Sequence, residues 1–192
     1  PVGKTVNRTT TFTAYVYKKQ FKVTFVYANG QSDLVTWVYY DDNVTMPQDP
    51  TYTGHTFNGW VCSVDGRMYT YSNPYTAGVR QEITFGASWD NNQVTVRFFG
   101  LDSTTPLSTQ TINYDSYVTP PTVTIDEENT LKRFKNAWTR RGDTSGTVIP
   151  NSWFNENRIR TNMDFDGKFV NLYKVRFYTP DEGNQVYIIP RQ

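Results

Sequence analysis

The sequence predicts a mostly β fold, α+β at most, that is built from small units repeated in tandem. Its 192 residues include 28 Thr, 19 Val and 14 Tyr but only 5 Leu and 5 Ala. Thr, Val and aromatic side chains favour strands, whereas Leu and Ala favour helices. Four motifs return in the same order along the chain, with offsets of 73 to 80 residues. A recurrence at a nearly constant period is typical of tandem repeats.

The composition also excludes several classes of protein. Nineteen Lys+Arg against 18 Asp+Glu give a net charge of +1, which lacks the concentrated basic excess of nucleic-acid-binding proteins. The single cysteine, Cys62, excludes an internal disulfide and argues against a cysteine-ligated zinc site. The sequence has no run of about 18 apolar residues that could span a membrane, and it does not open with a signal segment. We expect a soluble stretch of a longer exterior protein, without membrane insertion and without a cofactor.

The first complete unit is expected over residues 21–92. The segment Phe21–Tyr27 alternates in polarity and stops at the turn signal Asn29-Gly30, so it predicts a hairpin with the next strand. Segment 46–50 holds two prolines, which lack an N–H, and this excludes both a helix interior and a central strand. The expected strands of this unit are 21–27, 34–40, 56–61 and 81–89.

The second complete unit is expected over residues 93–172, because the markers of the first unit return there. Val23-Thr24-Phe25 becomes Val96-Arg97-Phe98, and Tyr40-Asp41 becomes Tyr114-Asp115. A residue that returns at the same place in each unit is best explained by a small core that every unit must build for itself. The repeat-core markers are Phe25, Phe57, Trp60, Phe85, Trp89, Phe98, Phe134, Trp138, Phe165 and Phe177.

Partial units are expected at both ends. Residues 1–20 carry the alternating marker of a closing strand and would end a preceding repeat, while 173–192 would start a following one with strands at 173–178 and 185–189. Isolated partial units would leave apolar strand edges open, so we expect both ends to be paired, by the rest of their own units or by a neighbouring subunit. Within the second unit a short helix is possible in 125–137, where acidic residues suit a first helical turn.

The first unit resembles a known family along its length. The run Phe21–Trp60 combines a Val-Thr-Phe strand that ends in Asn-Gly, a Tyr-Asp before Val-Thr-x-Pro, and the motif Gly54–Trp60, and Ile83–Trp89 follows as a closing strand. These residues resemble the Listeria–Bacteroides repeat, also called the B-repeat of internalin-type bacterial surface proteins. The second unit is similar at its strands but departs at its centre. There Thr130–Arg133 replaces the Thr-Gly lead-in, and Ala137 replaces a glycine.

The resemblance implies a β-grasp-like fold, strung in tandem into an elongated array. The family is not known for catalysis, so it implies no catalytic, cofactor-binding or metal-binding residues here. We therefore expect a non-enzymatic spacer module of an extracellular protein on the bacterial cell surface, which holds other domains away from that surface through contacts between neighbouring repeats. Two alternatives stay open. One is an adhesin-type module for a glycan or a host protein, and the other is a virion exterior protein, such as a phage decoration, fibre or capsid-associated protein.

Few residues suit a functional site. His55, the single histidine, falls inside the repeat motif. Cys62 is expected to be buried and to pack as a small apolar residue. A structural role is therefore expected for both. The acidic clusters lack the glycine and glutamate spacing of a calcium-binding EF-hand loop. Arg141-Gly142-Asp143 spells the tripeptide that integrins recognise, and it lies in a polar stretch that should be an exposed loop. The candidate interaction residues are Arg141, Gly142, Asp143, Trp153 and Phe154.

Overall fold

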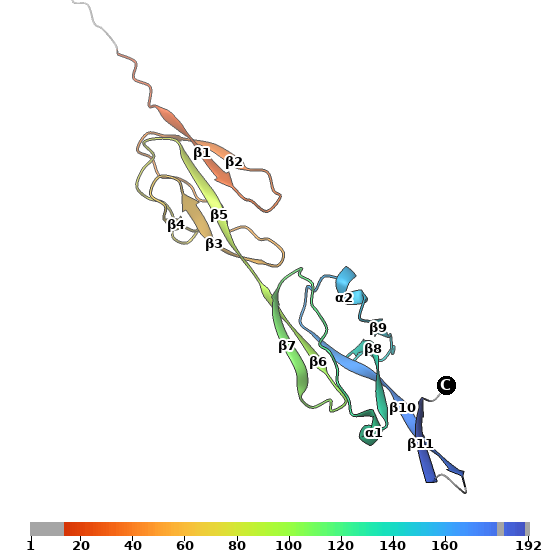
Figure 1. The fold of residues 1–192 in the computed structure, drawn as a ribbon. Helices are drawn as coiled ribbons and strands as arrows, with labels where there is room; N and C mark the ends of the chain where they lie inside the picture. Colours follow the sequence, from red (N-terminus) through yellow and green to blue (C-terminus); the bar gives the residue numbers. More distant parts are fainter. Residues whose placement is uncertain (1–13, 180–182, 191–192) are drawn as a thin grey trace, which may run out of the picture. The chain divides into compact units, whose positions relative to one another are not determined.

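The computed structural model describes residues 14–179 and 183–190, and these separate into two compact units (Figure 1). The first unit ends at Trp89 and the second begins at Asp90, except that Thr53–Thr56 group with the second unit. Both units consist mostly of strands, which confirms the fold class predicted from the composition. Among the described residues, no helix is long and apolar enough to span a membrane.

The first unit is a five-stranded mixed sheet. Its strands are β1 (Gln20–Val26), β2 (Leu34–Tyr39), β3 (His55–Cys62), β4 (Met68–Tyr69) and β5 (Ile83–Asn91). They lie in the order β2-β1-β5-β3-β4. Strand β1 pairs antiparallel with β2, which confirms the predicted hairpin, and parallel with β5. The first and last strands of the unit are therefore neighbours inside the sheet.

The core of the first unit is aromatic. Phe25 of β1 stacks on Phe85 of β5 with ring centroids 5.0 Å apart, and Trp60 of β3 meets Phe25 edge-on at 5.1 Å. All three side chains are completely buried, and each buried ring stabilises the unit by about 1.5–3 kcal/mol. Val44 and Met46 reach the same core from the irregular, proline-containing segment between β2 and β3. That segment therefore covers the sheet without forming a helix.

The second unit is a mixed sheet with two short helices. Its strands are β6 (Gln93–Phe99), β7 (Pro106–Asn113), β8 (Lys132–Arg140), β9 (Ile149–Pro150), β10 (Met163–Thr179) and β11 (Gly183–Pro190), and its helices are α1 (Glu127–Thr130) and α2 (Trp153–Glu156). The sheet has the order β7-β6-β10-β8-β9, and β11 pairs with the distal part of β10. Strand β6 pairs antiparallel with β7 and parallel with β10.

The short helix expected within 125–137 is present as α1, with Glu127 and Glu128 in its first turn. The Asp126 carboxylate caps the first turn of α1 by accepting a hydrogen bond from the Asn129 N–H at 3.0 Å. The helix ends after one turn, because Leu131 takes a left-handed conformation with φ 51°, which cannot continue a right-handed helix. From Lys132 onward the chain is strand β8, so the helix occupies only the first part of this range.

The two sheets share their strand order and the arrangement of their rings. Phe98 of β6 stacks on Phe165 of β10 at 5.5 Å, and Trp138 of β8 meets Phe98 at 4.8 Å. Phe98 lies opposite Phe165 in the ladder, as Phe25 lies opposite Phe85 in the first unit. The predicted markers that are completely buried are Phe25, Trp60, Phe85, Phe98, Trp138 and Phe165, whereas Phe57, Trp89 and Phe134 are partly buried. The side chain of Phe177 is outside the part that the structure describes.

The two ends of the chain differ. Phe12, a marker of the closing strand expected in 1–20, lies outside the described residues, and 14–19 form no regular element. Val16 in this stretch is 88% exposed. At the other end, the strands expected at 173–178 and 185–189 are present as the distal part of β10 and as β11, and they pair antiparallel. The boundary expected after residue 172 falls inside β10, which continues without a break.

Candidate functional site

His55 and Cys62 are the residues best suited to catalysis, and they are the first and last residues of β3. Cys62 is 1% exposed, and burial raises the pKa of its thiol above the ordinary value. The reactive thiolate is therefore disfavoured. His55 Nδ1 lies 3.0 Å from the carbonyl oxygen of Thr53, next to a turn. Among the described residues, no three His, Cys, Asp or Glu side chains gather into a group that could hold a metal ion.

Arg141, the first residue of the candidate interaction loop, is bound within its own unit. Its guanidinium donates to Asp166 Oδ1 of β10 at 2.6 and 3.0 Å and to the Ser103 carbonyl oxygen at 2.8 Å. It also lies 3.4 Å from the centroid of the Phe99 ring. The hydrogen bonds to Asp166 raise the pKa of Arg141 further above its ordinary value. The guanidinium thus links β6, β10 and the turn between β6 and β7 within its own unit rather than projecting into solvent.

Asp143 and Trp153 lie together at a shallow hollow. The Asp143 carboxylate accepts hydrogen bonds from the Ser145 N–H at 2.8 Å and the Ser145 hydroxyl at 2.7 Å, and these bonds lower the pKa of Asp143 and keep it charged. The hollow has a volume of about 240 Å³ and is lined by Arg140, Asp143, Thr147, Ile149 and Trp153. Phe154 lies instead in the core, with an exposed fraction of 0%. Of the two neighbouring aromatic residues expected in this loop, only Trp153 reaches the hollow.

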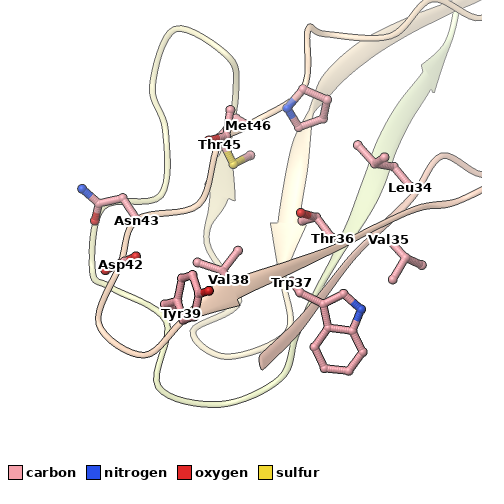
Figure 2. Close-up of a pocket in the computed structure, with 11 residues that line it drawn as sticks. Leu34, Val35, Thr36, Trp37, Val38, Tyr39, Asp42, Asn43, Thr45 and Met46 are labelled. Atoms are coloured by element: carbon pink, nitrogen blue, oxygen red, sulfur yellow. The ribbon is translucent and has the colours of Figure 1, made fainter. Parts of the chain in front are cut away.

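Edge strand β2 carries a surface that the sequence analysis does not identify. Val35, Trp37 and Tyr39 are 49%, 59% and 46% exposed. Figure 2 shows Val35 and Trp37 on one side of β2, whereas its other side faces the segment that contains Met46. Strand β2 and residues from segment 42–47 line a groove of about 490 Å³. Apolar residues on both faces of an edge strand are the signal that could have revealed this surface, because the outer face of such a strand is usually polar.

The second unit has polar residues at the three positions that correspond to Val35, Trp37 and Tyr39. Trp37 lies opposite Lys22 of β1, and Thr111 lies opposite Thr95 of β6. Lys22 and Thr95 each directly precede the Val-x-Phe motif of their strand. By this register, β2 has Val35, Trp37 and Tyr39 where β7 has Thr109, Thr111 and Asn113. Because a sheet of the same strand order forms with Thr at this position, the fold does not require the Trp37 ring.

Each unit also holds an Asp–Arg pair that the sequence analysis misses. Asp41, with φ 67°, accepts a hydrogen bond from Arg80 Nε at 2.9 Å, and Asp115, with φ 61°, accepts one from Arg160 Nε at 2.6 Å. In both units the Asp N–H also donates to the carbonyl of the residue before that Arg, at 2.7 and 2.8 Å. The two Asp residues are repeat markers, but their Arg partners follow 39 and 45 residues later. This unequal spacing hides the pair from a motif search.

Residues 21–88 match the family model of the Listeria-Bacteroides repeat domain. The match begins in β1 and ends in β5, so it spans all five strands of the first unit. No curated protein matches the chain. The first unit of this chain is therefore a Listeria–Bacteroides repeat domain, a kind of repeat that is consistent with an extracellular surface protein.

Proposed function

We propose that the protein is a non-enzymatic spacer, a run of repeat units within a larger exterior protein that holds other domains away from a surface. The observation that carries this proposal is the shared strand order and ring arrangement of the two sheets, the first of which matches a repeat family. Each unit buries its aromatic rings internally, and in repeat proteins of this kind added copies add length. We place the protein outside the cell on a bacterial surface, with the exterior of a virion as the alternative.

In this proposal the second unit, residues 93–172, is a diverged copy of the first. The Asp115–Arg160 pair in place of Asp41–Arg80 supports this view. The second unit also accommodates one extra residue at its centre without losing the arrangement of its core, which again indicates a diverged copy. Asn136 of β8 has φ 52°, and the ladder shifts its register in β10 beside it. Asn tolerates this left-handed conformation better than most residues, and Trp138 stays in the core.

The proposal also requires that neighbouring units have little freedom relative to each other. Strand β5 ends at Asn91 and β6 begins at Gln93, so one residue separates a closing strand from the next opening strand. The reach of a flexible linker grows with its number of residues, and a single residue, Asn92, is available here. The distal part of β10 with β11 repeats the opening hairpin of each unit. This supports a following copy that starts at residue 173.

Small-angle scattering of the whole chain tests the spacer. A compact globe of 192 residues would have a radius of gyration of about 16 Å. We expect a value at least about 1.5 times as large, with a pair-distance distribution that extends in a long tail. A radius near that of the globe, with a symmetric distribution, would contradict the proposal.

The hollow at Arg140, Asp143 and Trp153 favours a second candidate, an adhesin-type module that binds a glycan or a host protein. It gathers a cation, a carboxylate and an indole ring on one surface, and Trp offers a rigid apolar face together with a hydrogen-bond donor. A glycan array and a panel of host matrix proteins, probed with the whole chain and with the Trp153→Ala variant, test this function. Binding that the variant loses would favour the adhesin. Absence of binding by either protein would favour the spacer.

A further inference from the structure

In each unit the first and last strands are hydrogen-bonded neighbours that run in the same direction. Residues 23–26 of β1 pair with 83–86 of β5, and residues 96–99 of β6 pair with 163–166 of β10. The chain enters the first unit at the start of β1 and leaves it at the end of β5. A pull on the two ends of this unit therefore draws two neighbouring strands in opposite directions along their shared ladder, and the same holds for β6 and β10.

We propose that each unit is a mechanical clamp, which carries tension along the chain as shear between its first and last strands. This inference rests on the spacer function, in which the chain is pulled from both ends. Hydrogen bonds in a parallel ladder are evenly spaced, and a force along the strands loads all of them at once. A force that peels a hairpin open loads one pair at a time. Forced unfolding is governed by the unfolding rate under load. Because the direction of the pull sets how many hydrogen bonds must break together, it also sets that rate and the force that a unit withstands.

The side chains of β1 oppose sliding of the ladder. A slip of one residue would turn Val23 and Phe25 from the core face to the solvent face, and both side chains are completely buried. A slip of two residues would keep the face but would separate Phe25 from Phe85 and Trp60, whose ring centroids lie 5.0 and 5.1 Å away. The core must therefore open before the strands can move past each other. Phe98 holds the equivalent position in the second unit, between Phe165 and Trp138.

The second clamp has an ion pair across its ladder. Arg97 of β6 lies directly opposite Asp164 of β10, and its guanidinium donates to both carboxylate oxygens at 2.7 and 2.5 Å. In the first unit Thr24 lies opposite Thr84 at the corresponding place. A bidentate pair of this kind fixes direction as well as distance, so it resists displacement along the strands. The protein thus contains one clamp with an ionic link and one without.

Single-molecule force spectroscopy on the whole chain tests this proposal. A pull on the two termini first peels β11 from β10, because Pro190 lies opposite Leu172, and then loads both ladders in shear. Each unit should then unfold in a separate event that releases about 25 nm of chain, given at most about 3.6 Å per residue. The control pulls the protein through cysteines introduced at Gln20 and Tyr39, which lie opposite each other at the end of the β1–β2 hairpin. Cys62→Ala is present in both experiments. We expect the shear geometry to require at least about twice the force of the peeling geometry, and equal forces would overturn the clamp.

The first unit supplies the matched variant for the second. The double substitution R97T/D164T gives the second ladder the residue pair of the first. We expect the unfolding rate extrapolated to zero force to rise by about two- to fivefold for one of the two events, the effect of a surface ion pair, while the other event stays unchanged. Unchanged rates for both events would overturn the assignment of the clamp to β6 and β10.

The outcomes for the clamp and the spacer can be distinguished. A particle that is extended in scattering but ruptures at equally low force in both geometries would refute the clamp alone. A compact particle whose units resist shear more strongly than peeling would refute the spacer and leave the clamp in place.

Discussion

Replacing Phe25 by Ala should strongly destabilise the first unit and leave the stability of the second unit unchanged. The Phe25 ring has an exposed fraction of 0% and contacts both Phe85 and Trp60. Its loss removes the transfer free energy of the ring and leaves a cavity that rigid neighbours cannot fill. Substitutions of this kind lower the free energy of unfolding by about 3–5 kcal/mol. Phe98→Ala is the matched change in the second unit, because Phe98 is equally buried between Phe165 and Trp138.

The size of this loss decides the outcome. At about 0.05–0.15 kcal/mol per residue, a unit of roughly 70 residues has a total free energy of unfolding of about 4–10 kcal/mol. One ring therefore supplies a third or more of the stability of its unit. A unit near the lower end of this range would be unfolded in the absence of denaturant, while its neighbour would keep its own core.

Urea denaturation, followed by circular dichroism and by tryptophan fluorescence, measures both units in one chain. We expect Phe25→Ala to lower the midpoint of one transition and Phe98→Ala to lower that of the other, each without moving its partner. If either substitution lowered both transitions equally, the two cores would form one cooperative unit. If either cost less than about 1 kcal/mol, the ring would not be a core residue, and in both cases the reasoning would fail.

Trp37 can be replaced by Thr, the residue found at the corresponding place in β7. In urea denaturation this substitution should change the free energy of unfolding by less than about 0.5 kcal/mol. A loss above about 2 kcal/mol would show that the fold needs the Trp37 ring. The Tyr69 hydroxyl donates to Asp65 at 2.6 Å, which raises the pKa of Tyr69 from its ordinary value of 10.0 to about 12. Because the folded value lies above the unfolded one, this stabilisation is complete below about pH 10 and is lost as the pH rises towards 12. Ultraviolet titration should show a late tyrosinate for Tyr69, and Asp65→Asn should move its titration to lower pH. Cys62 should react with a thiol reagent at least about tenfold more slowly in the folded chain than in urea, and equal rates would show that its thiol is accessible.

The longer strands and the main core rings could be predicted because their signals are local and repeated, whereas the two-residue strands β4 and β9 were not expected. Phe25, Phe85 and Trp60 each lie in a short segment that alternates or carries the family motif, and each has a counterpart about one repeat length later. Period-2 alternation depends only on the geometry of a strand. Repetition then separates core rings from surface rings without knowledge of the fold.

Other features depend on contacts between distant segments and could not be predicted. Val44 and Met46 are buried from a segment without periodicity, and only the packed sheet shows which of its side chains point inward. Phe154 sits among polar residues that suggest an exposed loop, yet it packs against Phe165 at 5.0 Å. The exposure of Trp37 follows from the position of β2 at the edge of the sheet. The sequence of β2 alone does not show that the strand lies at an edge.

The most direct test of the central claim, that the chain holds two complete copies of one small repeat, is the amide NMR spectrum of a chain trimmed to residues 21–172. We expect a dispersed spectrum in which the amides near Phe25 and Phe98 keep the chemical shifts that they have in the whole chain. Any association through residues 1–20 and 173–192 should be lost. Collapse of the signals of either unit would show that the end residues belong to its core, which would contradict the boundaries at 21, 92 and 172.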